Sequence, residues 1–585
     1  MPGTGATECQ LPRLIRASAA VPPALLTRRT RPKEFPIIPL SRPRLRVESL
    51  VALIALYAVA FGNGPWWSAI SAGRVASAPG TWLFLGCTFV ALAALHFVLF
   101  ALVSNRWTAR PLLTLLVIAT AFATYYMRTY AVILDPTMLR NVVKTDVRET
   151  RELLSWALFG WVFAWSALPV ALIWWVDLER SPAWRAAAFR VAALVGGLVV
   201  IVLALLPISR DMTSVMRNQR ELRYLITPAN FIYSLGRNAA NDARGAALPR
   251  VALGTDARSL LPADPQRRPR VFVLVLGETA RAANFSLFDY PRQTNPELAA
   301  LDIVAFSDVT SCGTSTEVSV PCMFSRQGRA AYDEQQIRRS EGVLHVLARA
   351  GYDVQWLDNQ SGCKGVCDGP GITFRKLDAA YAPDLCHGED CLDEILVRAL
   401  GEQLAGVTRD TVFVLHTIGN HGPAYYRRYP DAFRRFLPDC RTAELRDCSR
   451  EEVVNAFDNA LLYTDHVVAS MIGTLQQASS RLDAALLYVS DHGESLGEGG
   501  LYLHGLPWSI APRVQTHVPM VLWISAGFAA AADLDMACLK KRAAEPLSHD
   551  NLFDTMLGAM AVQTSVYRSD LDLFSPCRGT TAALP

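Results

Sequence analysis

The chain has 585 residues, enough for several domains, and its net charge of +4 gives no reason to expect a nucleic-acid partner. Hydrophobic residues make up 51% of the chain and charged residues only 19%, a balance that is unusual for a wholly soluble protein and indicates a membrane part. The basic residues are uneven, since residues 13–46 contain nine Arg or Lys residues and one acid, Glu34. We therefore expect residues 1–46 to form a cytoplasmic Arg/Pro-rich tail.

Five apolar runs follow this tail, at 47–63, 82–103, 111–132, 154–176 and 190–207. Each is near the ~20 residues that a helix needs to cross a bilayer. A helix is expected because a segment in lipid must satisfy its own backbone hydrogen bonds. The alternative is that these runs are buried helices of a soluble protein. Five such runs in close succession argue against it. The sequence therefore predicts an all-α membrane domain of five transmembrane helices over residues 47–207.

The distribution of arginine predicts the orientation of these helices, because cytoplasmic loops are enriched in Lys and Arg. Arg106 and Arg110 lie in the second loop, and Arg180, Arg185 and Arg190 lie in the fourth. Both loops share the side of the Arg-rich N-terminus. An odd number of spans then exports the chain after about residue 208.

The positions of the cysteines support the prediction that the second half of the chain is exported. Ten of the twelve lie beyond residue 208, and an even set in an oxidising compartment indicates disulfides. Close spacing suggests the pairs 312–322, 363–367, 386–391 and 440–448, which leaves 538–577, although sequence does not prove connectivity. A thiolate zinc site around Cys363 and Cys367 is the alternative, but that segment lacks a clear four-ligand pattern.

The exported half has the pattern of an α/β domain. Residues 208–268 form a linker with helical segments, and the domain follows at 269–585. Short apolar runs at 271–276, 352–357, 411–415, 484–489 and 518–524 alternate with helix-like stretches. Continuous apolar strands separated by helices predict a mostly parallel central sheet.

Metal-ligating side chains follow three of these strands. They are Glu278 after the first, His416, Asn420 and His421 after the third, and Asp491, His492 and Glu494 after the fourth. Ligands of open α/β sheets bind beyond the carboxyl ends of the strands. A single acid at a strand end is usually a helix cap or a solvated group, but three strand ends together favour a zinc site.

Hydroxyl groups are concentrated between two cysteines, at 311–324. A helix that begins there would offer free N–H groups to a phosphate. A threonine hydroxyl is a poor nucleophile in water, and an adjacent zinc ion would favour its ionised form. Taken alone, this segment is more typical of a Ser/Thr-rich capping loop.

Several motifs, in one order along the chain, resemble the lipid A phosphoethanolamine transferase family, which includes the polymyxin- and colistin-resistance enzymes. They are Gly277-Glu278-Thr279-Ala280-Arg281, the segment 312–324, Ser361-Gly362-Cys363-Lys364-Gly365, Gly419-Asn420-His421-Gly422-Pro423, Ser490-Asp491-His492-Gly493-Glu494 and Leu501-Tyr502-Leu503-His504-Gly505. The resemblance implies a five-span membrane domain followed by a periplasmic domain of the alkaline phosphatase/sulfatase superfamily, in a multi-pass protein of the bacterial inner membrane.

The resemblance also implies the roles of individual residues. Glu278, Thr316, Asp491 and His492 match the zinc ligands, and Thr316 also matches the nucleophile, with Thr314 as a less favoured alternative. His421 and His504 match histidines that hold the substrate phosphate or a second zinc. The other residues that match substrate-binding positions are Lys364, Ser361, Asn141, Thr145 and Glu149. If the third loop is helical, Asn141, Thr145 and Glu149 share one face, which could meet an ethanolamine ammonium or be a solvated interfacial face.

The implied reaction moves phosphoethanolamine from phosphatidylethanolamine to lipid A through a zinc-activated threonine and a covalent phosphothreonine, which would lower surface charge and confer polymyxin resistance. The expected partners are these two lipids and other membrane lipids, with no nucleic acid, and the chain is expected to be a monomer with Zn²⁺ as its cofactor. The alternatives are a related transferase that acts on core heptose or another glycan, one that transfers phosphoglycerol, and a scaffold that has lost its chemistry.

Overall fold

The computed structural model describes residues 42–579 except 146, 247–248, 265 and 389, and it leaves out the side chains of 147–149 and 245–246. A compact unit begins at Arg44. Residues 1–41 of the N-terminal tail, Asp146 in the third loop and the side chain of Glu149 therefore lie outside the described residues.

The apolar runs form helices long enough to cross a membrane. Four helical segments qualify by length and composition: α3 (Pro79–Val103), α4 (Ala109–Thr129), α7 (Trp156–Trp175) and Ala183–Asn218, which begins with α8 (Ala183–Leu205). The first run forms α1 (Val47–Phe61), which is followed after a 54° bend by α2 (Gly64–Ser71), and this pair counts as a fifth span if it is one broken helix. The most apolar stretches of α7 and α8 are only 22% and 11% buried, as expected of helices that face lipid.

Two differences from the sequence prediction concern helix ends. Helix α8 begins at Ala183, seven residues before the predicted apolar run, because Pro182 precedes an Ala-rich stretch that continues the helix beyond its most apolar part. The third loop contains α5 (Pro136–Lys144) and α6 (Val147–Leu153), and the helix is interrupted at Thr145. A continuous helical face through Asn141, Thr145 and Glu149 therefore does not form.

The second half is built on an eight-stranded sheet of order β15-β5-β14-β11-β4-β10-β6-β7. Five adjacent strands run parallel: β11 (Asp483–Ser490), β4 (Arg270–Gly277), β10 (Thr411–His416), β6 (Asp353–Asp358) and β7 (Ile372–Lys376). Strand β14 (His517–Ile524) is antiparallel to β11 and to β5 (Val304–Thr310), and β15 (Leu547–Ser548) completes the edge. The mostly parallel sheet predicted from the sequence is confirmed.

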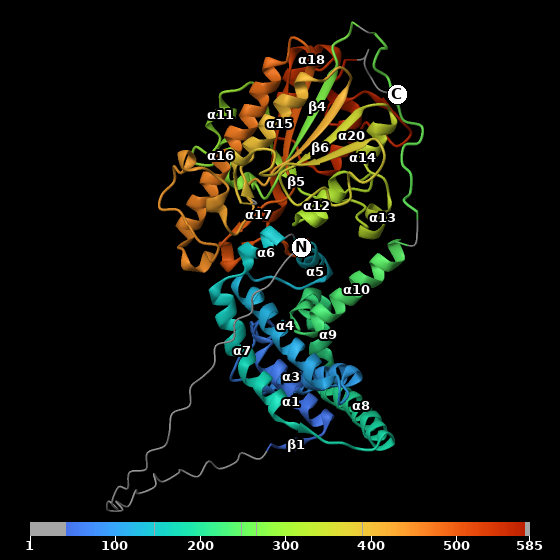
Figure 1. Ribbon diagram of the computed structural model, residues 1–585, viewed down its shortest axis with the longest axis vertical. Coiled ribbons are helices and arrows are strands. Elements are labelled where there is room, and N and C mark those ends of the chain that lie inside the picture. Colours follow the sequence, from blue (N-terminus) through green and yellow to red (C-terminus); the bar gives the residue numbers. More distant parts are fainter. Residues whose placement is uncertain (1–41, 146, 247–248, 265, 389, 580–585) are drawn as a thin grey trace, which may run out of the picture. The chain divides into compact units, whose positions relative to one another are not determined.

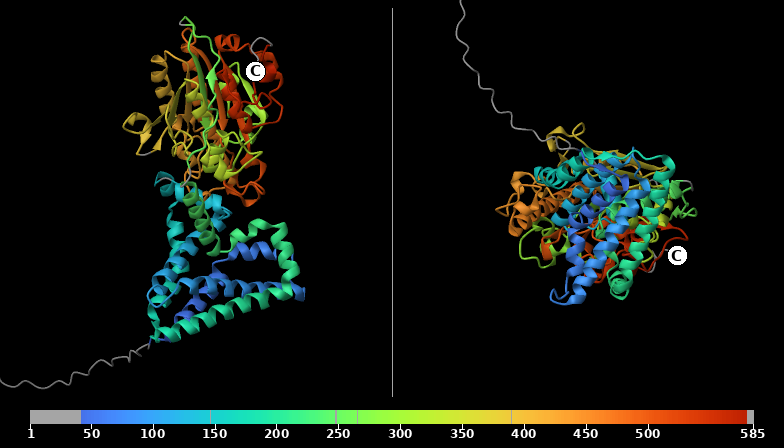
Figure 2. Two further views of the ribbon diagram at one scale, coloured as in Figure 1. Left: turned by 90° about the vertical axis from the view of Figure 1, so that its right-hand side faces the viewer. Right: turned by 90° about the horizontal axis from the view of Figure 1, so that it is seen from below.

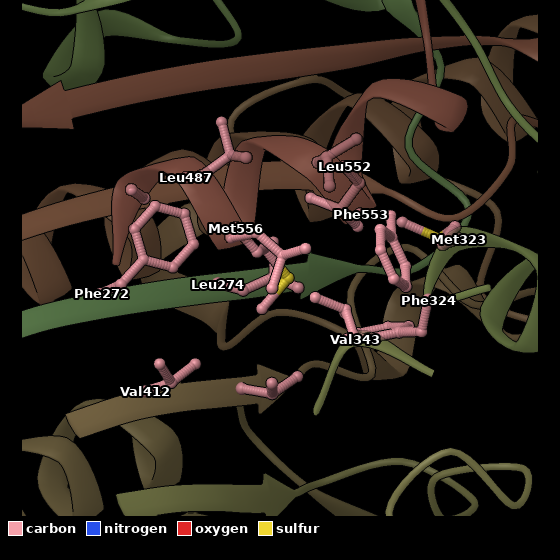
Figure 3. Packing of buried hydrophobic residues seen from close by; sticks show 14 of the residues in the cluster. Phe272, Leu274, Met323, Phe324, Val343, Val412, Leu487, Leu552, Phe553 and Met556 are labelled. Carbon is pink, nitrogen blue, oxygen red and sulfur yellow. The ribbon is translucent and has the colours of Figure 1, made fainter. Parts of the chain in front are cut away.

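Helices cover both faces of this sheet (Figures 1 and 2). Helices α12 (Thr316–Met323), α14 (Val343–Arg349) and α20 (Asp550–Ala559) pack on one face, and α15 (Glu394–Ala405) and α16 (Arg450–Gln477) pack on the other. Alternate residues of β4 serve the two cores, since successive side chains of a strand point to opposite faces. Figure 3 shows Phe272 and Leu274 of β4 in the core that also contains Met323 of α12 and the next residue, Phe324. Burial on both faces explains why β4 is apolar throughout.

The five disulfides predicted from spacing are confirmed: Cys312–Cys322, Cys363–Cys367, Cys386–Cys391, Cys440–Cys448 and Cys538–Cys577. The thiolate zinc site is excluded at Cys363 and Cys367, because both sulfur atoms are in a disulfide. The first disulfide ties the loop before α12 to the last turn of that helix, and so it restrains the helix that begins at Thr316.

Candidate active site

The site lies where two neighbouring parallel strands end. Glu278 follows β4, and Asp491 and His492 follow β11, which pairs with β4 in register from Asp483 with Arg270 to Ser490 with Gly277. This register brings three potential metal-ligand atoms within 4.8 Å of one another. All three side chains are buried, with 1% or less of their surface exposed. A buried cluster of two carboxylates and an imidazole has the donor types of a zinc site.

Thr316 completes this cluster from a third element. It is the first residue of α12, and its hydroxyl donates a hydrogen bond to Glu278 Oε2 at 3.0 Å and lies 3.4 Å from His492 Nε2. The amides of the first turn of a helix have no intrahelical acceptors. Thr316 therefore places its hydroxyl beside the candidate metal ligands and beside backbone donors that suit an anion.

The surroundings of His492 orient its ring. Its Nδ1 lies 2.9 Å from the carbonyl oxygen of Gly493, which can only accept a hydrogen bond, so Nδ1 carries a proton. Nε2 then faces Glu278 at 3.3 Å and Asp491 at 3.5 Å. Ligating histidines are commonly oriented in this way by a second hydrogen bond. Gly493 also allows the backbone of Val514 to pack closely against this turn, because a Cβ at position 493 would lie 2.1 Å from the Val514 carbonyl oxygen.

The electrostatics of the cluster favour a cation. Burial, followed by the charge of Glu278, raises the pKa of Asp491 to about 6. Burial opposes the protonation of His492, but Asp491 and Glu278 outweigh it and raise the pKa of that imidazole to about 10. The second oxygen of Asp491, Oδ2, is buried and has no hydrogen-bond partner. A divalent cation would satisfy that oxygen and replace the proton that the two carboxylates otherwise attract.

The two other predicted histidines lie beside this cluster. The ring centroid of His504 is 4.3 Å from that of His492 and 6.1 Å from that of His421. His504 Nδ1 lies 3.2 Å from Glu494 Oε2, and the other oxygen of that buried carboxyl group has no hydrogen-bond partner. Burial, its largest cause, raises the pKa of Glu494. His421 and His504 thus lie in succession beside His492, at one side of the cluster.

The remaining predicted site residues do not all contact the cluster of Glu278, Asp491 and His492. Ser361 and Lys364 contact each other, with Nζ donating to Oγ at 2.6 Å. Asn141 Oδ1 accepts a hydrogen bond of 3.4 Å from Ser315, the residue before Thr316. Thr145 instead donates its hydroxyl to the carbonyl of Asn141 at 2.7 Å. His416, a possible ligand in the sequence, is paired with Asp358 at 2.9 Å.

Sequence reasoning missed two residues that hold Glu278. Gln360 is buried and donates to Glu278 Oε2 at 2.9 Å, and Thr279 donates its hydroxyl to Oε1 at 2.5 Å. Thr279 has a φ of +62°, which is rare for a β-branched residue and often marks a functional site. Gln360 precedes the Ser361-Gly362-Cys363 motif, so a wider reading of that motif could have included it.

Comparison with known proteins identifies the family. The chain is 38% identical over 542 residues to phosphoethanolamine transferase EptA of Escherichia coli (strain K12), which covers 92% of this chain and 98% of that protein. The chain belongs to the EptA family of phosphoethanolamine transferases. The EptA/EptB family model matches residues 92–243 and the sulfatase model matches residues 270–562, so the two models match parts of both halves of the chain.

Two further EptA relatives extend this comparison. Phosphatidylethanolamine transferase Mcr-1 of Escherichia coli is 37% identical over 482 residues, which covers 81% of this chain and 89% of Mcr-1. The structure of the integral membrane lipooligosaccharide phosphoethanolamine transferase A (EptA) of Neisseria meningitidis matches with a TM-score of 0.86 at 35% identity, covering 92% of this chain and 100% of that one. This EptA-family chain is accordingly an integral membrane protein with a periplasmic sulfatase-like domain.

Proposed function

We propose that this protein transfers phosphoethanolamine from phosphatidylethanolamine to lipid A through a covalent phosphothreonine at Thr316. The observation that carries the proposal is the position of the Thr316 hydroxyl, 3.0 Å from Glu278 and 3.4 Å from His492 at the start of α12. The family membership supports the phosphoethanolamine group and the lipid acceptor. The single nucleophile predicts two half-reactions and ping-pong kinetics.

We assign Glu278, Asp491, His492 and Thr316 as ligands of Zn²⁺. When bound, the ion supplies Lewis acidity that favours ionisation of a hydroxyl group and offsets the charge of the transferring phosphoryl group. The protein's own contribution is orientation. Gln360 and Thr279 hold the Glu278 carboxylate, and the Gly493 carbonyl holds the His492 ring. Preorganised groups of this kind need no rearrangement during the reaction.

In the first half-reaction the Thr316 oxygen forms a bond to phosphorus, and the bond between phosphorus and the diacylglycerol oxygen breaks. The hydroxyl proton leaves along its hydrogen bond to Glu278, and the diacylglycerol oxygen gains a proton, for which His421 and His504 are the nearest assigned donors. In the second half-reaction a phosphate oxygen of lipid A forms a bond to the phosphorus of the phosphothreonine, and the bond between phosphorus and the Thr316 oxygen breaks. Thr316 regains its proton along the hydrogen bond to Glu278, and the histidines regain the proton they gave up from the attacking phosphate or from water. The product carries a new ammonium group, which lowers the negative charge of the outer surface and would confer polymyxin resistance.

The test is to express the full chain in a polymyxin-sensitive Gram-negative host and to weigh its lipid A by mass spectrometry. Thr316→Ala removes the nucleophile, and Thr314→Ala is the matched control, because the Thr314 hydroxyl is engaged with the Leu506 carbonyl at 2.7 Å. A species heavier by one phosphoethanolamine should appear with wild type and with Thr314→Ala, and should be absent with Thr316→Ala.

Other outcomes separate the alternatives. Activity in an expressed Thr316→Ala protein would refute the nucleophile. Unmodified lipid A together with modified core heptose or another glycan would show that the acceptor is that sugar rather than lipid A. A phosphoglycerol adduct would show that the transferred group is phosphoglycerol.

A further inference from the structure

Five side chains line an open cleft at the end of α4 that adjoins the periplasmic domain: Tyr125, Arg128, Thr129, Trp161 and Arg446. We call it the arginine cleft. The first three residues belong to α4, Trp161 belongs to α7, and Arg446 lies in the short helix η8 (Leu445–Asp447) of the periplasmic domain. The cleft therefore lies where two membrane helices meet an exported loop. A further contact at this end joins Tyr130 to the carbonyl of Ala443 at 3.5 Å.

Both arginines lie over aromatic rings. The guanidinium carbon of Arg128 is 5.3 Å from the ring centroid of Trp161, and that of Arg446 is 5.3 Å from the ring centroid of Tyr125. Arg446 also donates a hydrogen bond to the Thr129 hydroxyl. Aromatic faces orient a guanidinium without neutralising its charge.

Neither charge is balanced by an ion pair. Among the described residues neither Arg128 nor Arg446 forms a salt bridge, whereas many arginines of this chain do. The neighbouring acid, Glu444, is buried and accepts a hydrogen bond of 2.8 Å from the Tyr125 hydroxyl. Two oriented guanidinium groups at an open cleft are a suitable arrangement for a phosphate, to which arginine donates paired hydrogen bonds.

We propose that the arginine cleft binds a phosphate group of the acceptor lipid A. This inference rests on the proposed function. The cleft lies at the membrane surface, where Trp156 at the start of α7 is 89% exposed, as tryptophans of an interfacial belt are. A phosphate monoester of lipid A carries close to two negative charges, which two arginines match. Phosphatidylethanolamine is a weaker candidate, because its phosphodiester carries one negative charge and its ammonium group would be repelled.

A short hairpin connects the cleft to the active site. Tyr125 and Tyr130 share a hydrophobic cluster with Tyr502 and Leu503 of strand β13 (Tyr502–Leu503). The next residue is His504, whose ring centroid is 4.3 Å from that of His492. Lipid A carries phosphates at both ends of its disaccharide, so one phosphate held in the cleft leaves the other available to the phosphothreonine. The cleft thus orients the acceptor rather than taking part in the chemistry.

The experiment uses the full-length enzyme in detergent micelles with Arg128→Gln/Arg446→Gln. Two rates are measured: release of diacylglycerol from phosphatidylethanolamine without acceptor, and transfer to lipid A at varied lipid A concentration. The double variant should raise KM for lipid A about 10-fold or more, the loss expected for charge-assisted hydrogen bonds, with kcat and the diacylglycerol burst changed by less than about 2-fold. Arg128→Lys/Arg446→Lys should recover part of the affinity, since it restores both charges.

Arg106→Gln is the matched control, because Arg106 also lies over a tryptophan ring, 4.3 Å from the Trp107 centroid, but in the loop at the opposite end of α4. It should leave KM unchanged. An unchanged KM in the double variant would overturn the proposal, and a smaller diacylglycerol burst would assign the cleft to the donor instead.

A direct measurement of lipid A binding to the wild type and the double variant keeps the two proposals distinguishable. If wild type releases no diacylglycerol, the proposed function fails. Weaker binding by the double variant would then still support a phosphate site in the cleft, and equal binding would exclude it.

Discussion

The hydroxyl group of Thr316 donates a hydrogen bond of 3.0 Å to Glu278, across a sequence separation of 38 residues and between two different elements of the fold. Glu278 directly follows a buried strand, and Thr316 begins a helix that packs on the same sheet. The relationship is maintained by a disulfide on the Thr316 side and by Gln360 and Thr279 on the Glu278 side.

Neutralising a carboxylate of the cluster should remove the metal. Glu278→Gln and Asp491→Asn each replace an anionic ligand with an amide, and we expect bound zinc to fall from near one per chain toward zero and transfer to fall at least about 100-fold. Elemental mass spectrometry of the purified protein measures the metal. Asp308→Asn is the control, since that acid pairs with Arg513 on the surface. Full zinc occupancy in both variants would refute the ligand assignment.

Removing His504 should slow transfer without emptying the first metal site. His504→Ala deletes the imidazole beside His492 but leaves Glu278, Asp491 and Thr316 in place. We expect a loss of about 10²-fold in transfer, the size typical of a general acid or base. His466→Ala, at a partly exposed histidine beside Glu297, should be neutral. If His504→Ala instead loses its zinc, His504 is a metal ligand rather than a substrate-binding residue.

Arg338 should stabilise the first turn of α12. Pro321 lies inside that helix and has no N–H to donate to the carbonyl of Glu317, and Arg338 donates to this carbonyl at 3.0 Å and to the Glu317 carboxylate at 2.9 Å. Arg338→Ala leaves both acceptors unpaired and should cost about 1–3 kcal/mol of stability. The midpoint temperature of thermal unfolding and kcat should both fall, while the zinc content should be unchanged.

The control for Arg338 is Arg398→Ala, which removes an exposed pair with Asp384 and should cost about 0–1 kcal/mol. Equal losses in the two variants would mean that Arg338 contributes only an ordinary surface pair.

His549 should make the periplasmic domain sensitive to acid. Its Nδ1 accepts from the Cys312 amide and its Nε2 donates to the Ser490 carbonyl, both at 3.0 Å, so the folded state requires the neutral ring. Burial lowers its pKa to about 3 from the ordinary 6.5. Below about pH 6.5 the unfolded chain binds a proton that the folded chain does not, so stability should fall from pH 6.5 toward 3 by up to about 1.4 kcal/mol per pH unit.

The measurement is the free energy of unfolding of the full-length protein between pH 4 and pH 8, with His549→Gln beside wild type. The variant should be less stable at pH 8 but should lose less stability on acidification. A parallel pH dependence in the two proteins would show that other groups cause the acid sensitivity.

Much of this architecture could be predicted because it depends on local patterns. Membrane spans need long apolar runs, parallel strands buried on both faces are apolar throughout, and cysteines a few residues apart pair within one loop. The edge of the sheet was harder to predict. Strands β5 and β7 were not predicted, since β5 contains Ser307 and Asp308 and β7 contains Arg375 and Lys376, so neither has the apolar pattern of a central strand.

The sequence by itself determined the residue types of the site and their positions after strands, because the chemistry of Glu278, Thr316, Asp491 and His492 and the ends of apolar runs can be read locally. Only the tertiary structure decided which of these groups meet. The register of β4 with β11 brings Glu278 to His492, whereas His416, at the end of the next strand, is paired with Asp358. The arginine cleft likewise joins Arg128 to Arg446, more than three hundred residues apart, since contacts between distant elements depend on packing and leave no periodic pattern in the chain.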